Sequence, residues 1–266
     1  MAEDPRGEAS QMSDASDSVH AVVTGGGTGI GLAVAQALAR HGHAVTVMGR
    51  SAQTLAPAVE SLPGGGFVIC DVTSDESVAR ALSEAQAARG PVRVLVNNAG
   101  AVTTAAFEKT SIEAWSAALD VNLLGAVRMT RAAIASLKSH PWGRVINMAS
   151  TAGLKPYAYV SPYVASKHAL VGFTRALALE LATTGVTVNA VCPGYTRTSI
   201  IERAIETIAT RTGRDPETAA AVFTAANPQG RLVTPSEVAS AVVWLASADA
   251  QAVNGIALSI SGGETG

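Results

Sequence analysis

The sequence has few charged residues, two cysteines and no hydrophobic run long enough to cross a membrane. Charged residues make up 15% of its 266 residues, and the formal net charge is −2. This balance gives no electrostatic reason to bind nucleic acid or a membrane surface, and a membrane span needs about 20 consecutive apolar residues. Cys70 and Cys192 match no metal or redox spacing. We therefore expect no metal site and two buried, reduced thiols in a cytoplasmic protein.

Residues 1–18 also lack the basic start and the apolar centre of a signal peptide. They contain five acidic residues and a single basic residue, Arg6, and we expect them to form a disordered, solvated tail. The chain is 48% hydrophobic, and residues 19–266 are numerous enough for one domain with a substantial core. No internal repeat and no Ser/Pro-rich linker divides them, so the sequence predicts a single domain there.

From His20 onward, short β-branched runs alternate with longer runs rich in Ala and Leu. Strands that read as continuous apolar runs, each followed by a helix, indicate a parallel sheet covered on both faces. Right-handed crossovers then predict an α/β fold with a doubly wound (Rossmann), mostly parallel seven-stranded sheet and helices on both faces. The predicted strands are 20–24, 44–49, 66–71, 92–100, 143–150, 185–194 and 254–263, and the main predicted helices are 31–42, 51–61, 75–90, 108–138 and 161–184.

Residues 195–235 interrupt this alternation with a stretch that reads as helical but irregular. It lies between the sixth strand and the next helix, at the carboxyl edge of the sheet, where folds of this kind bind ligands. Long insertions at such places are often functional. We interpret 195–235 as a lid over a bound substrate; the alternative is a helical decoration with no part in binding.

A glycine-rich loop, VVTGGGTGIG at 22–31, includes the end of the first strand and runs into a helix. Gly25, Gly29 and Gly31 fit the pattern in which a tight turn lets backbone N–H groups approach a pyrophosphate at the positive end of a helix. The chain has 25 glycines, so the loop alone is weak evidence. The order of strand, loop and helix within a parallel sheet is what the motif requires, and it predicts a dinucleotide site.

The end of the second strand favours NADP(H) over NAD(H). A carboxylate there would accept hydrogen bonds from the ribose diol and repel a 2′-phosphate. The sequence instead reads TVMGRS, with Gly49 and Arg50. The glycine leaves room for a phosphate, and a guanidinium can bind one bidentately. NAD(H) stays possible, because Arg50 could simply be a solvated loop residue.

Six segments occur in an order typical of one family. They are TGGGTGIG (24–31), NNAG (97–100), Asn122 in DVNLLG, Ser150 in INMAS, YVASK (163–167) and PGYTRT (193–198). Together they resemble the single-domain short-chain dehydrogenase/reductase family over about residues 19–263. The resemblance implies an enzyme that transfers hydride between a nicotinamide dinucleotide and a ketone or secondary alcohol.

The catalytic residues can be argued from the chemistry of ketone reduction. Hydride transfer places negative charge on the carbonyl oxygen, which needs a hydrogen bond and then a proton. A free tyrosine, with a pKa of about 10, is a poor acid–base catalyst at neutral pH, so we expect Lys167, one turn along the same helix face, to lower the pKa of Tyr163. Ser150 is placed to donate a second hydrogen bond to the substrate. The resemblance implies that Asn122 holds a water linking Lys167 to solvent and that Lys167 binds the nicotinamide ribose.

The resemblance also implies where the cofactor lies. We expect the adenine beside Asp71, the adenosine ribose beside Asn98 and Gly100, and the nicotinamide beside Pro193, Gly194 and Thr198. The full predicted cofactor set is Thr24, Gly25, Thr28, Gly29, Ile30, Gly31, Arg50, Asp71, Val72, Asn98, Ala99, Gly100, Tyr163, Lys167, Pro193, Gly194 and Thr198.

The substrate is expected to be a 3-oxoacyl thioester or a hydrophobic ketone, because the chain most resembles reductases of 3-oxoacyl thioesters and aromatic polyketide ketones. The pocket candidates after Ser150 are mostly small or apolar, which suits an alkyl or aryl ketone; they are Thr151, Ala152, Leu154, Pro156 and Tyr157. Tyr157, Tyr159 and Tyr195 could be pocket walls or ordinary packing.

Two sets of positions bear on the group that carries the substrate. Reductases that act on carrier proteins tend to place basic residues near the mouth of the site. Pro141 and Thr184 occupy two such places here, which weakens the case for a carrier protein and leaves a coenzyme A thioester or a free ketone possible. Arginines in the lid could meet a phosphate-bearing substrate or form a solvated face with the acids among them; they are Arg197, Arg203, Arg211 and Arg214.

Three functions other than ketone reduction are possible for this fold. An NAD(H)-dependent dehydrogenase of small or aryl secondary alcohols would use the same site. A nucleotide-sugar epimerase usually carries a further C-terminal domain, and a non-enzymatic dinucleotide sensor often loses catalytic residues that are present here. By resemblance, the helices at 108–138 and 161–184 and the last strand are expected to build a homotetramer.

Overall fold

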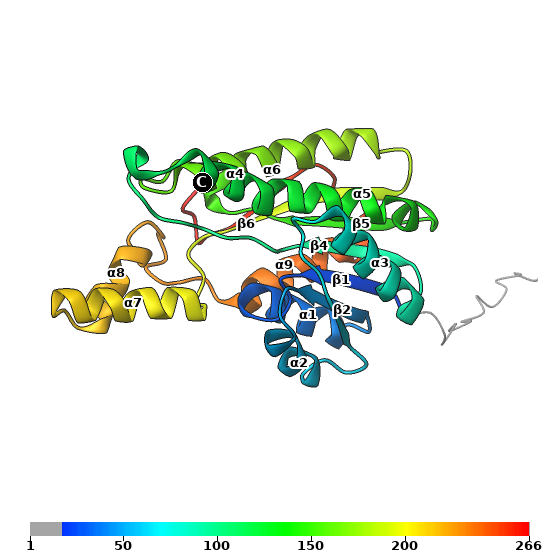
Figure 1. Cartoon of the computed structure of the whole chain (residues 1–266), viewed down its shortest axis with the longest axis horizontal. Helices are drawn as coiled ribbons and strands as arrows, with labels where there is room; N and C mark the ends of the chain where they lie inside the picture. The colour runs from blue at the N-terminus through cyan, green and yellow to red at the C-terminus, as the bar shows by residue number, and fades with distance from the viewer. Residues whose placement is uncertain (1–17, 266) are drawn as a thin grey trace, which may run out of the picture.

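Seven parallel strands form one sheet in the computed structural model, which describes residues 18–265 (Figure 1). The strand order is β3-β2-β1-β4-β5-β6-β7, and every neighbouring pair is parallel. The predicted fold class is therefore confirmed. Apart from Ser18, the predicted N-terminal tail lies outside the described residues. The strands are β1 (His20–Thr24), β2 (Ala44–Gly49), β3 (Gly66–Ile69), β4 (Val92–Asn97), β5 (Gly143–Met148), β6 (Val186–Pro193) and β7 (Ala257–Ile260).

The central strands are buried on both faces, as continuous apolar runs predict. In β1, Ala21 and Val23 point into one hydrophobic cluster, and Val22 between them points into the other. Successive strands run outward from β1 in one direction and from β4 in the other, so the order reverses between these two. The loops that follow β1 and β4 diverge there and leave a crevice at the carboxyl edge of the sheet.

Helices cover both faces of the sheet (Figure 1). The helices α1, α2 and α9 contribute to the cluster that contains Val23, whereas α3, α5 and α6 contribute to the cluster that contains Val22. The helices of these two layers are α1 (Gly29–Arg40), α2 (Ala52–Glu60), α3 (Asp75–Arg89), α4 (Ile112–Leu119), α5 (Gly125–Lys138), α6 (Ser161–Glu180) and α9 (Pro235–Ala246), with short 3₁₀ turns η1 (Phe107–Lys109), η3 (Thr151–Gly153) and η4 (Ala248–Ala250). Among the described helices, none combines the length and the apolar character needed to cross a membrane.

The predicted helix at 108–138 is a series of shorter elements. A 3₁₀ turn and α4 lead into a π-helical turn, η2 (Asp120–Leu124), and α5 follows. The prediction of one uninterrupted helix was therefore wrong. Apolar periodicity cannot reveal one extra residue in a turn, and π-helical turns of this kind occur often at functional sites. This one contains Asn122.

The region predicted as a lid contains α7 (Ser199–Thr212) and α8 (Pro216–Thr224). Figure 1 shows the two helices projecting together from one end of the sheet, away from the layers. Gly213 ends α7 in a left-handed conformation with φ of +66°, and the Asp215 side chain caps α8 by accepting from the Thr218 N–H at 2.9 Å. These two termini explain why the stretch reads as irregular helix rather than as one continuous element.

Candidate active site

Two cavities lie beside each other at the carboxyl edge of the sheet, and Tyr163 lines both. The first, the glycine-side cavity, has a volume of about 350 Å³ and is lined by the glycine loop and the segment after β4. The second, the lid-side cavity, has a volume of about 370 Å³ and is lined by the segment after β5 and by α7. The other residues shared by both walls are Ile30, Val102, Ala149, Pro193, Thr198 and Ile200.

Most of the predicted cofactor residues meet in the glycine-side cavity. Gly194 lines the lid-side cavity instead, while Thr24, Arg50, Asp71 and Val72 line neither. The predicted residues in the wall of the glycine-side cavity are Gly25, Thr28, Gly29, Ile30, Gly31, Asn98, Ala99, Gly100, Tyr163, Lys167, Pro193 and Thr198.

The glycine loop is shaped for close approach to a ligand. Gly25 and Gly29 have positive φ angles of 63° and 54°, which residues with a side chain seldom adopt. A Cβ on Gly31 would lie 2.2 Å from the carbonyl oxygen of Gly25, so the first turn of α1 can pack on the loop only without a side chain there. Thr28 precedes α1 and makes no side-chain cap hydrogen bond. The first N–H groups of α1 can therefore bind an anion such as a pyrophosphate.

Thr24 and Asn98 join the glycine loop to the end of β4. The Thr24 hydroxyl oxygen accepts from the backbone N–H groups of Asn98 and Ala99, both at 3.0 Å. In return the Asn98 side-chain amide donates to the carbonyl oxygens of Thr24 and Gly25, at 3.0 and 3.1 Å. Thr24 therefore supports the loop without lining the cavity, while Asn98 both supports the loop and lines the cavity.

Arg50 and Asp71 lie past the ends of β2 and β3, at the edge of the site. The Asp71 carboxylate accepts from the N–H and the hydroxyl of Thr73, at 3.0 and 2.7 Å. These hydrogen bonds, with smaller contributions from the nearby charges of Arg50 and Arg128, lower the pKa of Asp71. Arg50 itself is exposed, so its guanidinium is free to meet a negatively charged group of a ligand. Neighbouring Gly49 leaves no carboxylate at the end of β2.

Tyr163 and Ser150 come together although they belong to different elements. Ser150 follows β5 and caps η3, where its hydroxyl oxygen accepts from the N–H of Ala152 at 3.1 Å. Tyr163 lies in the first turn of α6 and shares a side-chain hydrogen bond with Ser150. Burial raises the pKa of Tyr163, and this hydrogen bond opposes the increase only in part. The direction is opposite to the expected lowering, because desolvation is the largest influence on this phenol.

Lys167 lies one helical turn after Tyr163 and is almost completely buried, with 4% of its surface exposed. Its Nζ donates to the carbonyl oxygen of Met148 at 2.8 Å, and the residue lines the glycine-side cavity. Burial lowers the pKa of Lys167 to about 8. An amine with that pKa changes protonation within a unit or so of neutral pH, so its charge responds to small changes in its surroundings.

Asn122 fixes the backbone beside Lys167. Its side-chain carbonyl accepts from the N–H of Ala101 and its amide donates to the carbonyl of Ala101, both at 2.9 Å. A Cβ on Gly100 would lie 2.8 Å from Oδ1 of Asn122 and 3.6 Å from Nζ of Lys167. The π-helical turn thus places Asn122 next to the amine. The proposed water between Asn122 and Lys167 stays a prediction.

Comparisons with known proteins agree with this geometry. A family model described as short chain dehydrogenase matches residues 19–209. The D-beta-hydroxybutyrate dehydrogenase of Cupriavidus necator is 39% identical over 91% of this chain and 96% of its own. The monensin polyketide synthase putative ketoacyl reductase of Streptomyces virginiae is 40% identical over 91% of this chain and 95% of its own. A crystal structure of a variant of the actinorhodin polyketide ketoreductase with NADPH superposes with a TM-score of 0.87, at 38% identity, over 93% of this chain and 97% of that one.

The chain belongs to the short chain dehydrogenase family. Its members are NAD(P)-dependent oxidoreductases that act on CH–OH groups, and the match covers the glycine loop and the segment from Ser150 to Lys167. The resemblance inferred from the sequence motifs is therefore confirmed.

The lid-side cavity of this short chain dehydrogenase differs in part from the prediction. Thr151, Ala152 and Tyr157 line it, but the other two candidates do not. Leu154 packs against a hydrophobic cluster instead, and Pro156 is exposed. Both lie just after η3, and their side chains do not enter the cavity wall. The residues that sequence reasoning missed include Val102, Thr104, Val160, Ile200, Ile201, Ala204 and Phe223.

The three tyrosines that could be pocket walls or ordinary packing fall into two groups. Tyr157 and Tyr195 line the lid-side cavity, with ring centroids 6.1 Å apart in an edge-on arrangement. Phe223 of α8 packs edge-on against Tyr195, with ring centroids 5.1 Å apart, which connects α8 to another part of the cavity wall. Tyr159 is exposed and has a positive φ of 66°. Its carbonyl accepts from the N–H of Ala105 at 2.9 Å, so it ties two loops together outside the cavity.

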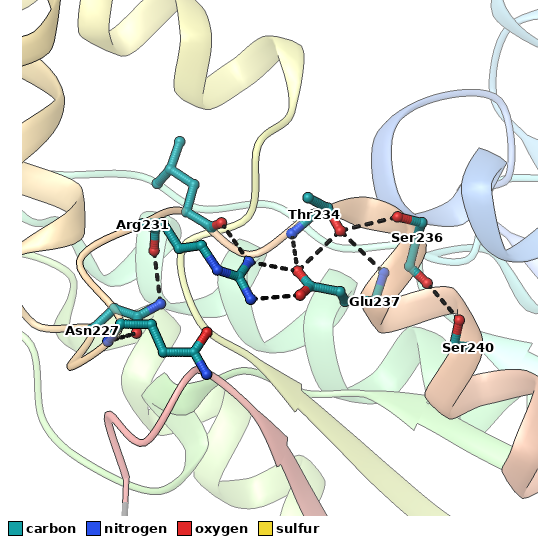
Figure 2. Close-up of polar contacts among 8 residues, drawn as sticks. Asn227, Arg231, Thr234, Ser236, Glu237 and Ser240 are labelled. Atoms are coloured by element: carbon teal, nitrogen blue, oxygen red, sulfur yellow. Dashed lines mark hydrogen bonds and ion pairs between the residues drawn. The ribbon is translucent and has the colours of Figure 1, made fainter.

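The base of the region 195–235 is held by a network of hydrogen bonds that Figure 2 shows. Glu237, at the start of α9, accepts from both terminal nitrogens of the Arg231 guanidinium, at 2.9 and 2.6 Å, and from the N–H of Thr234 at 2.7 Å. Asn227 donates to the carbonyl of Arg231 at 2.7 Å. The Arg197 N–H, at the other end of the region, donates to Val233 at 2.8 Å. The two ends of the region 195–235 are thus joined.

The residues expected to bear on the substrate carrier lie away from the cavity. Pro141 and Thr184 lie just before β5 and β6, at the amino edge of the sheet, whereas Ser150 follows the carboxyl end of β5. They do not border the mouth of the site in the same chain, so the inference drawn from them was wrong. The four lid arginines are exposed, and none lines the cavity; they are Arg197, Arg203, Arg211 and Arg214.

Proposed function

We propose that this short chain dehydrogenase reduces a ketone to a secondary alcohol with NADPH. The observation that carries the proposal is the position of Tyr163, whose side chain lines both cavities and hydrogen bonds with Ser150. A cofactor in the glycine-side cavity and a ketone in the lid-side cavity would meet at this tyrosine. The residues present fit a dinucleotide, because the loop makes a tight turn that a Cβ on Gly25 or Gly31 would disrupt, and an open cavity lies beside it.

The residues would divide the work as follows. The bound nicotinamide supplies the hydride for the carbonyl carbon. Ser150 donates a hydrogen bond to the substrate oxygen, and Tyr163 holds the proton at its hydroxyl and transfers it to that oxygen as negative charge develops there. Lys167, when protonated, stabilises the tyrosinate that remains. Its hydrogen bond to Met148 holds the amine in place, and Asn122 fixes the neighbouring backbone.

NADPH is preferred over NADH in this proposal. The end of β2 carries no carboxylate that would repel a 2′-phosphate, and exposed Arg50 can pair with one. The structurally similar actinorhodin ketoreductase was crystallised with NADPH. Asp71, Val72 and Arg50 would surround the adenosine end of the cofactor, beyond the described cavity wall.

The substrate would be a 3-oxoacyl thioester or another hydrophobic ketone. The lid-side cavity is lined mainly by apolar and aromatic side chains, and no Lys, Arg, His, Asp or Glu is among the described residues that line it. A polyhydroxylated substrate would find few partners there. The ketoacyl reductase relative from Streptomyces virginiae is named for such a reaction. An NAD(H)-dependent alcohol dehydrogenase is the alternative, favoured by the name of the Cupriavidus necator relative.

A direct assay separates these functions. The purified protein would be given NADPH or NADH with acetoacetyl-coenzyme A and a panel of aryl ketones, and the loss of nicotinamide absorbance would be followed. Turnover with NADPH supports the reductase. Turnover only with NADH, or only in the direction of alcohol oxidation, would instead support the alternative. No turnover of any ketone or alcohol with either cofactor would contradict both.

We also propose a homotetramer located in the cytoplasm. Exposed apolar residues lie along the helices expected at the interfaces, namely Ile112 in α4, Leu124 in η2 and Leu179 in α6. Such side chains are stabilised by contact with a second chain. Cys70 and Cys192 are free and buried, which supports a reducing compartment. A monomer in light scattering would contradict the tetramer.

A further inference from the structure

A buried carboxylate lies behind the wall of the lid-side cavity. Glu264, in the segment after β7, has a side chain that is only 1% exposed. Its Oε1 lies 2.9 Å from Nζ of Lys155, and it accepts a short hydrogen bond from the hydroxyl of Tyr157. A Cβ on Gly194 would lie 3.0 Å from the other oxygen. Neither the motifs nor the catalytic chemistry account for this acid.

The contacts of Glu264 determine the direction of the hydrogen bonds in the cavity wall. The Tyr157 hydroxyl has one proton, and it donates that proton to the carboxylate. The Thr151 hydroxyl lies 2.6 Å from the Tyr157 oxygen and must therefore be the donor in that pair. Burial and the hydrogen bond to Glu264 raise the pKa of Tyr157, so the phenol keeps its proton. Thr151 and Tyr157 both line the cavity. Because both hydroxyl protons are already donated within the wall, these oxygens offer a ligand only lone pairs.

The same carboxylate pairs with a positive charge beside this wall. Lys155 is the cation next to this wall, with its ammonium 5.1 Å from the centre of the Tyr157 ring, and Glu264 neutralises it. No Lys, Arg or His is among the described residues that line the cavity. A substrate with a free carboxylate would therefore lose its hydration, meet lone pairs at Thr151 and Tyr157, and find no cation in the described wall of this cavity.

We propose that Glu264 is a specificity-determining residue that excludes free 3-oxo acids and selects uncharged 3-oxo esters, thioesters and ketones. The inference rests on the proposed ketone reduction and names the substrate class of that site. It also separates this chain from its relative named as a hydroxybutyrate dehydrogenase, whose named substrate is a hydroxy acid. Glu264 itself acts through Tyr157, Thr151 and Lys155 rather than by touching the substrate.

The test compares acetoacetate with methyl acetoacetate, which differ in charge and by a single methyl group. With NADPH, we expect kcat/KM of the wild type to be roughly 100-fold or more higher for the ester, because an unpaired anion is costly to bury. Glu264→Gln keeps the shape and an acceptor for Tyr157 but leaves Lys155 unpaired. We expect it to shift the ratio towards acetoacetate by roughly tenfold or more, chiefly through KM, with the ester little changed.

Two further variants control for the position and the mechanism of the effect. Glu217→Gln removes the same charge from an exposed position in the first turn of α8 and should leave the ratio unchanged. Lys155→Gln combined with Glu264→Gln should cancel the gain for acetoacetate, because no unpaired cation remains.

The outcomes are distinct. Comparable wild-type efficiency for acid and ester would overturn the role of Glu264 while leaving the reductase intact, and this result needs no variant to fold. An unchanged ratio in Glu264→Gln would overturn it as well. If the wild type reduces neither acetoacetate nor methyl acetoacetate with either cofactor, the proposed reductase activity is overturned, and the selectivity with it.

Discussion

The ammonium group of Lys167 lies 5.6 Å from the centre of the Tyr163 ring, one turn further along α6. The two side chains share one helix face, and both line the glycine-side cavity. This spacing places a cation beside the phenol without an ion pair, so the amine can influence a tyrosinate and still face a ligand.

Replacement of Tyr163 by Phe removes the proposed proton donor and little else. We expect kcat/KM for ketone reduction to fall by about 10²–10⁴-fold, the usual contribution of a general acid, while the affinity for NADPH measured by fluorescence changes little. Tyr159→Phe is the matched control, because Tyr159 is exposed and lines neither cavity. Tyr163→Phe activity within a few-fold of the wild type would contradict the role assigned to Tyr163.

The buried Lys167 should make stability depend on pH. Its pKa in the folded protein is about 8, below the ordinary value of 10.5, so the unfolded chain binds the proton more tightly between these two values. The free energy of unfolding should therefore rise with pH from about 8 to 10.5 because of this group, by up to about 3 kcal/mol, and be independent of it below that window. Urea unfolding of the cofactor-free wild type and of Lys167→Met at pH 7.5, 9 and 10 isolates the effect. Parallel pH dependences of the two proteins would show that the amine does not titrate in this way.

The charge at Arg50 should control the choice of cofactor. Arg50→Asp replaces the proposed partner of the 2′-phosphate by a carboxylate that repels it and can accept from a ribose diol. We expect the ratio of kcat/KM for NADPH to that for NADH to fall by about 10–100-fold, consistent with the loss of a charge-assisted hydrogen bond.

Arg214→Asp is the control for the charge change, because Arg214 is exposed and lines neither cavity. It should leave the cofactor ratio unchanged. If both variants shift the ratio equally, a general field rather than contact at Arg50 would be responsible.

Gly31→Ala and Gly172→Ala should change the stability of the protein in opposite directions. Gly31→Ala would place a Cβ 2.2 Å from the Gly25 carbonyl oxygen and 2.5 Å from the Asn98 amide. Relief of that clash must move the loop, so we expect at least about 1–3 kcal/mol of destabilisation and weaker NADPH binding. Gly172→Ala meets no atom within 4 Å and lies within α6, and it should stabilise the protein by about 0.5–1 kcal/mol. Thermal unfolding and cofactor titration measure both; an unaffected Gly31→Ala would show that the loop tolerates the side chain.

The order of strands and helices could be predicted because each buried strand is a short apolar run and the turns between elements contain residue types typical of turns. β1 and β2 have the predicted bounds, whereas the predicted strands at 92–100 and 143–150 continue past the observed ends. The extra residues, which include Gly100 and Ser150, are apolar or small but leave the ladder to enter the site. Periodicity measures burial and not hydrogen bonding, so it cannot locate that departure.

The sequence by itself determined the fold class, the family and the proposed catalytic pair, because local motifs carry them: a glycine loop after a strand, and a tyrosine and a lysine one helical turn apart. The tertiary structure alone decided which residues line the lid-side cavity. Val102, Phe223 and Ile200 meet Tyr157 only when loops from separate strands converge, and Glu264 reaches Lys155 across more than a hundred residues of chain. It also decided the direction of the pKa shift of Tyr163, because desolvation depends on everything packed around a group. These properties depend on many residues that lie far apart in the sequence, so no local sequence pattern can reveal them.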